Sequence, residues 1–273
     1  MAGLRALTGC FLHVPLLAAV LAVVLFPSMA QPAEDAERIR ITNGEWPPYL
    51  GSDEPDYGPV SRIVTTALER ASVTVDYEFH SWQRALNLAR HGRREGTAVW
   101  FHTEAREKDF HISRPLIQSE YVFFHHRDLD FDWEDPEDLQ GYRIGITREY
   151  DYGEIIERLR DMDGVHVEQA SSDEHNFRKL LAGRIDLFPV DLFVGKEMIR
   201  REFASGQREQ LTWHARPVRS GGLSLLLSRS IPENADRMDR FNKELERMHE
   251  DGETEEILRD ALSDDVPVER ILP

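Results

Sequence analysis

The stretch that decides the fold runs from Ala98 to Phe110 and reads AVWFHTEAREKDF. Its first four residues are apolar and favour a buried β-strand, whereas Thr103 opens a charged segment with helical character. Thr103 is therefore expected to cap that helix. Three residues after the cap stands Arg106 and not the Glu or Gln of a capping box, so a cation lies where the helix dipole is already positive.

Two interpretations of Arg106 follow from this stretch. In the first, backbone N–H groups, the Thr103 hydroxyl and the Arg106 guanidinium converge on a bound anion such as a carboxylate. In the second, the segment is an ordinary surface helix in which Arg106 pairs with Glu107 or Asp109. The stretch alone favours neither interpretation.

Composition narrows the classes of partner. The 273 residues include 33 basic and 50 acidic side chains, which gives a formal net charge of −17. Such a surface repels nucleic acid and anionic lipid, so we expect neither as a partner. The single cysteine, Cys10, lies near the start of the chain, and the histidines have no metal-ligand spacing, so neither a metal nor a cofactor is expected.

Residues 1–30 differ from the rest of the chain. They carry one charged side chain, Arg5, then an apolar run over residues 14–26 and the sequence Ser28-Met29-Ala30. This pattern predicts a secretory signal cleaved after Ala30, with an uncleaved membrane anchor as the alternative.

The remaining chain alternates strand and helix patterns twice. The first succession has strands at residues 39–42, 73–79 and 98–101, with helices opening at Pro59 and at Ser81 between them. The second has strands at 142–147, 165–169 and 185–189 with helices at 152–160 and 173–182 between them. Short strands are also expected at 121–124 and 223–227, the latter followed by helices at 234–249 and 253–262. This alternation predicts an α/β protein of two lobes, each a mostly parallel sheet flanked by helices.

The order of the elements also predicts how the lobes are connected. We expect residues 38–126 and 218–273 to form lobe 1, with lobe 2, residues 127–217, inserted into it. Asp191 follows the last strand of the second succession, as Arg106 follows that of the first. Facing each other, the two would match a zwitterion, with Arg106 on its carboxylate and Asp191 on its ammonium group. Asp191 could equally cap the helix that follows it.

A family resemblance is carried by five segments in order: NGEWPPY, WQRAL, TEAREKDFHISRPL, EDLQGYRIGI and LLAGRIDLFPVD. Together they resemble the type II periplasmic solute-binding proteins of polar amino acid ABC transporters, the family-3 extracellular solute-binding proteins. The resemblance implies a monomeric periplasmic protein that closes two lobes around a small polar, amino-acid-like solute and delivers it to an inner-membrane ABC permease, without catalysis. A ligand-sensing module and a dehydratase-like enzyme on the same fold are the alternatives.

The resemblance also implies roles for particular residues. Arg106 would hold the ligand's carboxylate, Asp191 its amino group, and Trp46 would stack on it. The chain departs from the family at Val99 and Phe101, where small hydroxyl residues are usual, and at residues 148–152, which replace a glycine-threonine turn. These departures favour a larger, differently charged or modified ligand.

Three more residues complete the candidate site. Trp82 could cover the cleft or serve packing alone, and Tyr121 stands where the chain leaves the first lobe, with the same two options. Glu45, beside Trp46, could meet a cationic group of the ligand or be a solvated loop residue.

Overall fold

The computed structural model describes residues 37–148, 150–263 and 266–273. The expected signal segment, residues 1–30, lies outside these ranges. Among the described residues, none of the helices has the length and apolar character needed to cross a membrane. The strands are β1 (Glu37–Asn43), β2 (Val73–Phe79), β3 (Gly96–Phe101), β4 (Phe110–His126), β5 (Arg143–Thr147), β6 (His166–Ala170), β7 (Leu187–Asp191) and β8 (Leu211–Ser228).

Helices connect these strands and cover them. They are α1 (Pro59–Arg70), α2 (Trp82–Arg90), α3 (Glu104–Glu107), α4 (Gly153–Arg160), α5 (Asp173–Leu181), α6 (Leu192–Glu202), α7 (Ser205–Arg208), α8 (Asn234–Glu250) and α9 (Glu253–Ala261), with short 3-10 turns η1 (Pro55–Tyr57), η2 (Pro136–Leu139) and η3 (Val268–Arg270). The predicted caps of α3 and α5 are confirmed, because the Thr103 and Ser172 hydroxyls accept backbone hydrogen bonds there. The predicted apolar face of α1 is fully buried, as an amphipathic helix against a sheet requires.

The strands form one eight-stranded sheet in the order β2-β1-β3-β8-β4-β7-β5-β6. At one end β1 pairs in parallel with β2 and β3, and at the other β5 pairs in parallel with β6 and β7. Helical crossovers join the parallel strands, as the two predicted alternations require. Between the two ends, β8 and β4 pair antiparallel with each other and with β3 and β7 respectively. The sheet is therefore parallel at both ends and antiparallel in the middle.

Strands β4 and β8 are much longer than predicted. The sequence indicated strands of four and five residues, whereas β4 has 17 and β8 has 18. Pro115 and Pro217 interrupt the apolar pattern, because proline lacks the N–H that a regular ladder needs. The structure accommodates both prolines at irregularities of the β4–β8 register.

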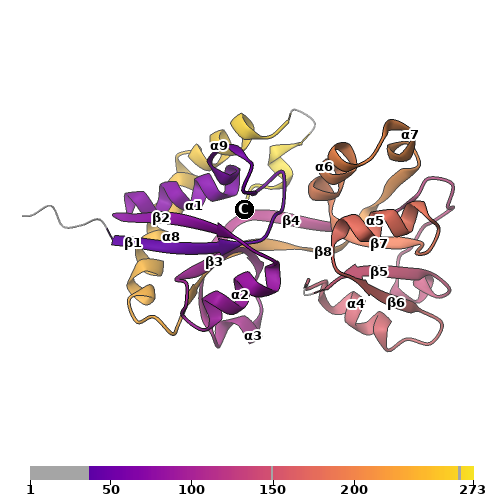
Figure 1. Cartoon of the computed structure of the whole chain (residues 1–273), viewed down its shortest axis with the longest axis horizontal. Helices are drawn as coiled ribbons and strands as arrows, with labels where there is room; N and C mark the ends of the chain where they lie inside the picture. Colours follow the sequence, from indigo (N-terminus) through magenta and orange to yellow (C-terminus); the bar gives the residue numbers. More distant parts are fainter. Residues whose placement is uncertain (1–36, 149, 264–265) are drawn as a thin grey trace, which may run out of the picture. The chain divides into compact units, whose positions relative to one another are not determined.

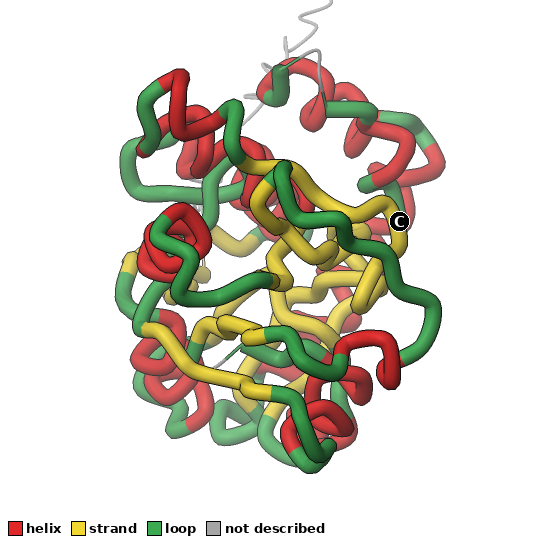
Figure 2. Tube along the Cα trace, turned by 90° about the vertical axis from the view of Figure 1, so that its right-hand side faces the viewer, coloured by secondary structure: helices red, strands yellow, loops and turns green. Residues whose placement is uncertain are grey.

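These two strands position the rest of the molecule. Figure 1 shows β1–β3 with α1, α2, α8 and α9 around one end of β4 and β8, and β5–β7 with α4–α6 around the other. We call these two sets the first and the second half. In Figure 2 the strands lie in the middle with helices around them. The segments that follow β3 in the first half and β5 in the second bring the candidate site together.

Candidate functional site

The turn after β3 is built as a short cap. The Thr103 hydroxyl accepts a hydrogen bond from the Arg106 N–H (3.3 Å), and the N–H groups of Arg106 and Glu107 donate to the Thr103 carbonyl (3.0 and 3.2 Å). Helix α3 has only four residues. The N–H groups of Arg106 and Glu107 are therefore used inside the turn, and the anion site expected at this helix start stays a prediction.

The Arg106 side chain turns inward from this cap. Its guanidinium donates to the Phe101 carbonyl (2.6 Å), lies 4.8 Å from the centre of the Trp100 ring and is 3.8 Å from the Asp151 carboxylate. Its side chain is 11% exposed. Burial lowers the pKa of Arg106, and the negative charge of Asp151 opposes that shift.

The surface-helix interpretation of Arg106 is wrong. Glu107 pairs with His102 (2.6 Å), and Asp109 pairs with Arg90 (2.9 Å). The acidic partner of Arg106 comes instead from the second half of the molecule, on the loop between β5 and α4.

Asp151 contacts a second arginine. Arg219, on β8, forms an ion pair with the Asp151 carboxylate and donates to the Asp151 carbonyl (2.9 Å). Its guanidinium lies 3.9 Å from the centre of the Phe101 ring. Neither Asp151 nor Arg219 was predicted as a site residue; the only signal in the sequence was the unusual charge and aromatic content of residues 148–152.

Aromatic side chains surround this ion pair. They enclose a small cavity of ≈ 30 Å³, whose lining residues are Trp46, Trp82, Val99, Trp100, Phe101, Arg106, Tyr121, Tyr150 and Asp151. The structure thus brings together five residues of the predicted site: Trp46, Trp82, Phe101, Arg106 and Tyr121. A cavity of this size holds about two water molecules, whereas small-molecule pockets are usually about 300 to 1,000 Å³.

Two local features shape the walls of this cavity. Val99 has φ 62°, in the left-handed region that β-branched residues avoid, at an irregularity of the β3–β8 register. Trp82 packs tightly on Gly44, where an added Cβ would lie 2.4 Å from the indole ring. Strained backbone and close packing of this kind fix side chains in place.

A larger cavity of ≈ 510 Å³ adjoins the small one and shares Trp82 and Tyr150 with it. From the first half it is lined by Glu45, His80, Ser81, Trp82 and Gln83, and from the second by Thr147, Arg148, Tyr150, Ser171, Ser172, Asp173, Glu174 and Met198. Its volume lies in the usual range for a small-molecule site. Glu45 lies here, accepting a hydrogen bond from the Ser52 N–H (3.0 Å).

Asp173 is the buried carboxyl group of this larger cavity. It accepts hydrogen bonds from the Thr147 hydroxyl and from the Tyr150 hydroxyl (3.1 Å). Burial raises the pKa of Asp173 to about 6, although these hydrogen bonds oppose the shift. Sequence analysis placed Asp173 only as the first residue of a helix.

Asp191 lies outside both cavities. One carboxylate oxygen accepts from the N–H groups of Phe193 and Val194 (3.0 Å each), and the other accepts from the Ser119 hydroxyl (2.7 Å). Asp191 is 1% exposed, and burial raises its pKa to about 6 against these hydrogen bonds. The structure therefore shows Asp191 capping α6 and does not bring it to Arg106.

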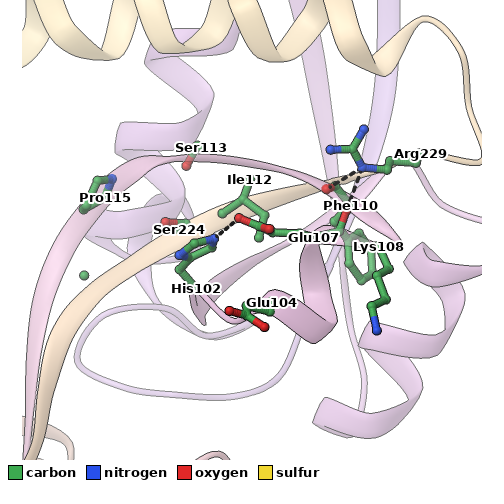
Figure 3. Close-up of a pocket in the computed structure, with 11 residues that line it drawn as sticks. His102, Glu104, Glu107, Lys108, Phe110, Ile112, Ser113, Pro115, Ser224 and Arg229 are labelled. Carbon is green, nitrogen blue, oxygen red and sulfur yellow. Dashed lines mark hydrogen bonds and ion pairs between the residues drawn. The ribbon is translucent and has the colours of Figure 1, made fainter.

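A cavity of ≈ 950 Å³ lies elsewhere, between α3, β4 and β8 (Figure 3). Figure 3 shows the His102 imidazole directed at Glu107 and the Arg229 guanidinium at two carbonyls, those of Glu107 (2.8 Å) and Phe110 (3.0 Å). All of its lining residues belong to segments 102–115 and 222–229. A solute here would touch none of the elements β5–β7, so we do not take it as the site.

Metal ligands are not gathered at any of these cavities. In the part of the chain that the structure describes, no group of three or more His, Cys, Asp or Glu side chains could hold a metal ion.

Comparisons with known proteins identify the fold. No family model matches the chain, and no curated protein does. Among solved structures, a histidine kinase sensor domain similar to periplasmic binding proteins has a TM-score of 0.71 at 19% identity, covering 87% of this chain and 99% of that one. An ancestral arginine-binding protein bound to arginine has a TM-score of 0.69 at 16% identity (83% and 98%). The substrate-binding protein of an amino acid ABC transporter has a TM-score of 0.66 at 15% identity (82% and 99%).

The chain therefore has the periplasmic-binding-protein fold, which confirms the predicted fold class and the resemblance to type II solute-binding proteins at the level of fold. Sequence identities this low show only that the fold is shared, because proteins with the same fold can have many different functions.

Proposed function

We propose that this protein is the solute-binding component of an ABC importer and binds a small polar, amino-acid-like solute by hinge closure. The observation that carries the proposal is the pair of adjoining cavities, which share Trp82 and Tyr150 and are lined from both halves of the molecule. A solute that contacts both halves stabilises the closed form over the open one. Binding without turnover is the activity we infer.

The lobes that we propose are those expected from the sequence: residues 38–126 with 218–273, and residues 127–217. The long strands β4 and β8 connect them and are the natural hinge. For ligand contacts we propose Trp46, Trp82, Phe101, Tyr121 and Glu45, on the walls of the two cavities. Thr103 and Asp191 would support this site through the turn after β3 and the start of α6, and Arg106 through its contact with Asp151.

Location and partner follow from the same proposal. We place the protein in the periplasm, exported by residues 1–30, as a monomer that docks on an inner-membrane permease. The similarity to the binding protein of an amino acid ABC transporter supports this partner.

A thermal-shift screen tests the proposal. The purified protein would be heated with amino acids, oligopeptides, polyamines, osmolytes and small carboxylates. A solute at about 100 times its dissociation constant stabilises a protein by about 2.7 kcal/mol, which is readily seen as a higher melting temperature. A panel in which no small polar solute has any effect would contradict solute binding.

A second candidate is a ligand-sensing module, which the similarity to the histidine kinase sensor domain favours. Both functions require solute binding, so the partner distinguishes them. Deleting the gene should abolish uptake of the identified solute if the protein serves an importer. Uptake that persists, with a transcriptional response to the solute that is lost, would favour sensing.

A further inference from the structure

Two arginine side chains, Arg106 and Arg219, form a cationic centre between the two halves, and a carboxylate of the protein itself occupies it. Asp151 contacts both Arg106 and Arg219, whose side chains are 11% and 15% exposed. The two guanidinium groups also contact other parts of the protein: the carbonyls of Phe101 and Asp151 and the faces of the Trp100 and Phe101 rings.

A ligand carboxylate would therefore compete with the Asp151 carboxylate for Arg106 and Arg219. To pair with Arg106 it would have to displace Asp151, since the cavity beside the ion pair measures ≈ 30 Å³. Asp151 is held in place by more than its two arginines, because its carboxylate also accepts a hydrogen bond from the Gly153 N–H (3.0 Å). Displacing it would break both ion pairs and this hydrogen bond, which opposes the entry of a ligand carboxylate.

The space for a solute lies next to the ion pair, in the ≈ 510 Å³ cavity. Trp82 and Tyr150 line both cavities, and the faces of aromatic rings attract organic cations. Three carboxylate residues, Glu45, Asp173 and Glu174, also line this cavity. Each already has a partner in the protein: Glu45 accepts from the Ser52 N–H, Asp173 from the Tyr150 hydroxyl, and Glu174 pairs with Arg178 (2.6 Å). Of the basic residues that line it, His80 contacts the Glu78 carboxylate (3.2 Å), and Arg148 is solvent-exposed, where ion pairs are weak.

We infer that Asp151 is a specificity-determining residue. It supplies from the protein the carboxylate that pairs with Arg106 and Arg219, so the solute is an organic amine that lacks a carboxylate and lies in the larger cavity beside Trp82 and Tyr150. This inference rests on the proposed solute-binding function and names the chemical class of its ligand.

Matched pairs of an amino acid and its decarboxylated amine test the inference. We would measure by calorimetry the binding of agmatine against arginine, putrescine against ornithine, and histamine against histidine. For at least one pair the wild-type protein should bind the amine at least about tenfold more tightly than the amino acid. Asp151→Ala should reverse that preference, because it releases Arg106 and Arg219 for the ligand carboxylate.

Controls separate specificity from folding. Asp163→Ala removes an exposed aspartate of the same half and should leave the preference unchanged. Asp151→Asn removes the charge while keeping a side chain of the same shape, and should weaken the preference for the amine if Asp151→Ala does not fold. Circular dichroism and melting curves would check each variant.

The other outcomes overturn the inference in distinguishable ways. Wild-type protein that binds an amino acid more tightly than its amine contradicts it while leaving the proposed function intact, and loss of that binding in Arg148→Ala would place the carboxylate at Arg148. Binding only of a solute that is neither amine nor amino acid also contradicts it. No response to any solute of the wider panel would refute the proposed function itself.

Discussion

The hydroxyl of Ser119 on β4 donates a 2.7 Å hydrogen bond to the carboxylate of Asp191 at the end of β7, and both residues are 1% exposed. Through this bond a long connecting strand is fixed to the cap of α6 in the second half. Ser119→Ala should lower the free energy of unfolding by about 1 to 3 kcal/mol, because it removes a donor from a buried charged acceptor. Urea unfolding would measure the change. The exposed Ser205→Ala is the control, and an equal effect in both variants would contradict this role.

Two buried carboxyl groups give stability a specific pH dependence. Burial raises the pKa values of Asp173 and Asp191 from 3.8 to about 6. Between about pH 4 and 6 the folded protein therefore binds more protons at these groups than the unfolded chain does. Their contribution to the free energy of unfolding must fall as pH rises through that window and stay constant above it. The fall is about 3 kcal/mol per group at most.

Asparagine variants isolate this contribution. Asp173→Asn and Asp191→Asn should each flatten the dependence of unfolding free energy on pH between 4 and 6. The exposed control Asp163→Asn should leave it as in the wild type. Ion-paired groups with lowered pKa values, such as Glu78 and Glu197, act in the opposite sense but at lower pH. Curves of equal slope for all variants would show that neither buried carboxyl group controls this window.

Trp82 depends on the absence of a side chain at position 44. An added Cβ on Gly44 would lie 2.4 Å from the Trp82 ring, so Gly44→Ala must displace the indole that lines both cavities. We expect a loss of about 1 to 3 kcal/mol in stability and a loss of solute-induced thermal shift. Gly206→Ala is the matched control, since nothing lies within 4 Å of its Cβ position. Retained solute binding in Gly44→Ala would argue against Trp82 as a ligand contact.

Local signals in the sequence predicted most helices and the parallel strands. A few neighbouring residues are enough to recognise helix caps such as Thr103 and Ser172 and the apolar face of α1, because helix and strand patterns repeat over short distances in the sequence. The full lengths of β4 and β8 were missed, since their prolines break the apolar pattern and their pairing joins residues about a hundred positions apart.

The candidate site was predictable only in part, because it too depends on contacts between residues that are far apart in the sequence. Trp46, Trp82, Phe101, Arg106 and Tyr121 stand out by residue type and by their place at the ends of strands, and the fold brings them together. The ion pair that occupies the centre joins Asp151 to Arg219, 68 positions further on, and to Arg106 from the other half. Ion pairs between distant segments depend on the tertiary fold. The sequence therefore left open what Arg106 binds, and only the family resemblance assigned its guanidinium to a ligand.

The last prediction concerns closure. Glu54, beside η1 in the first half, forms an ion pair with Arg201 on α6 in the second half. If the two halves close on the solute, this pair stabilises the closed form, and Glu54→Ala shifts the equilibrium toward the open form. A partly exposed ion pair contributes about 0.2 to 1 kcal/mol, so the apparent affinity for the solute should fall by about 1.4-fold to 5-fold. Calorimetry and small-angle scattering would measure affinity and compactness. The neighbouring Asp53→Ala is the control. Any contact that exists only in the closed form must contribute to the apparent affinity for the solute. An unchanged affinity in Glu54→Ala would therefore exclude a role for this ion pair in closure.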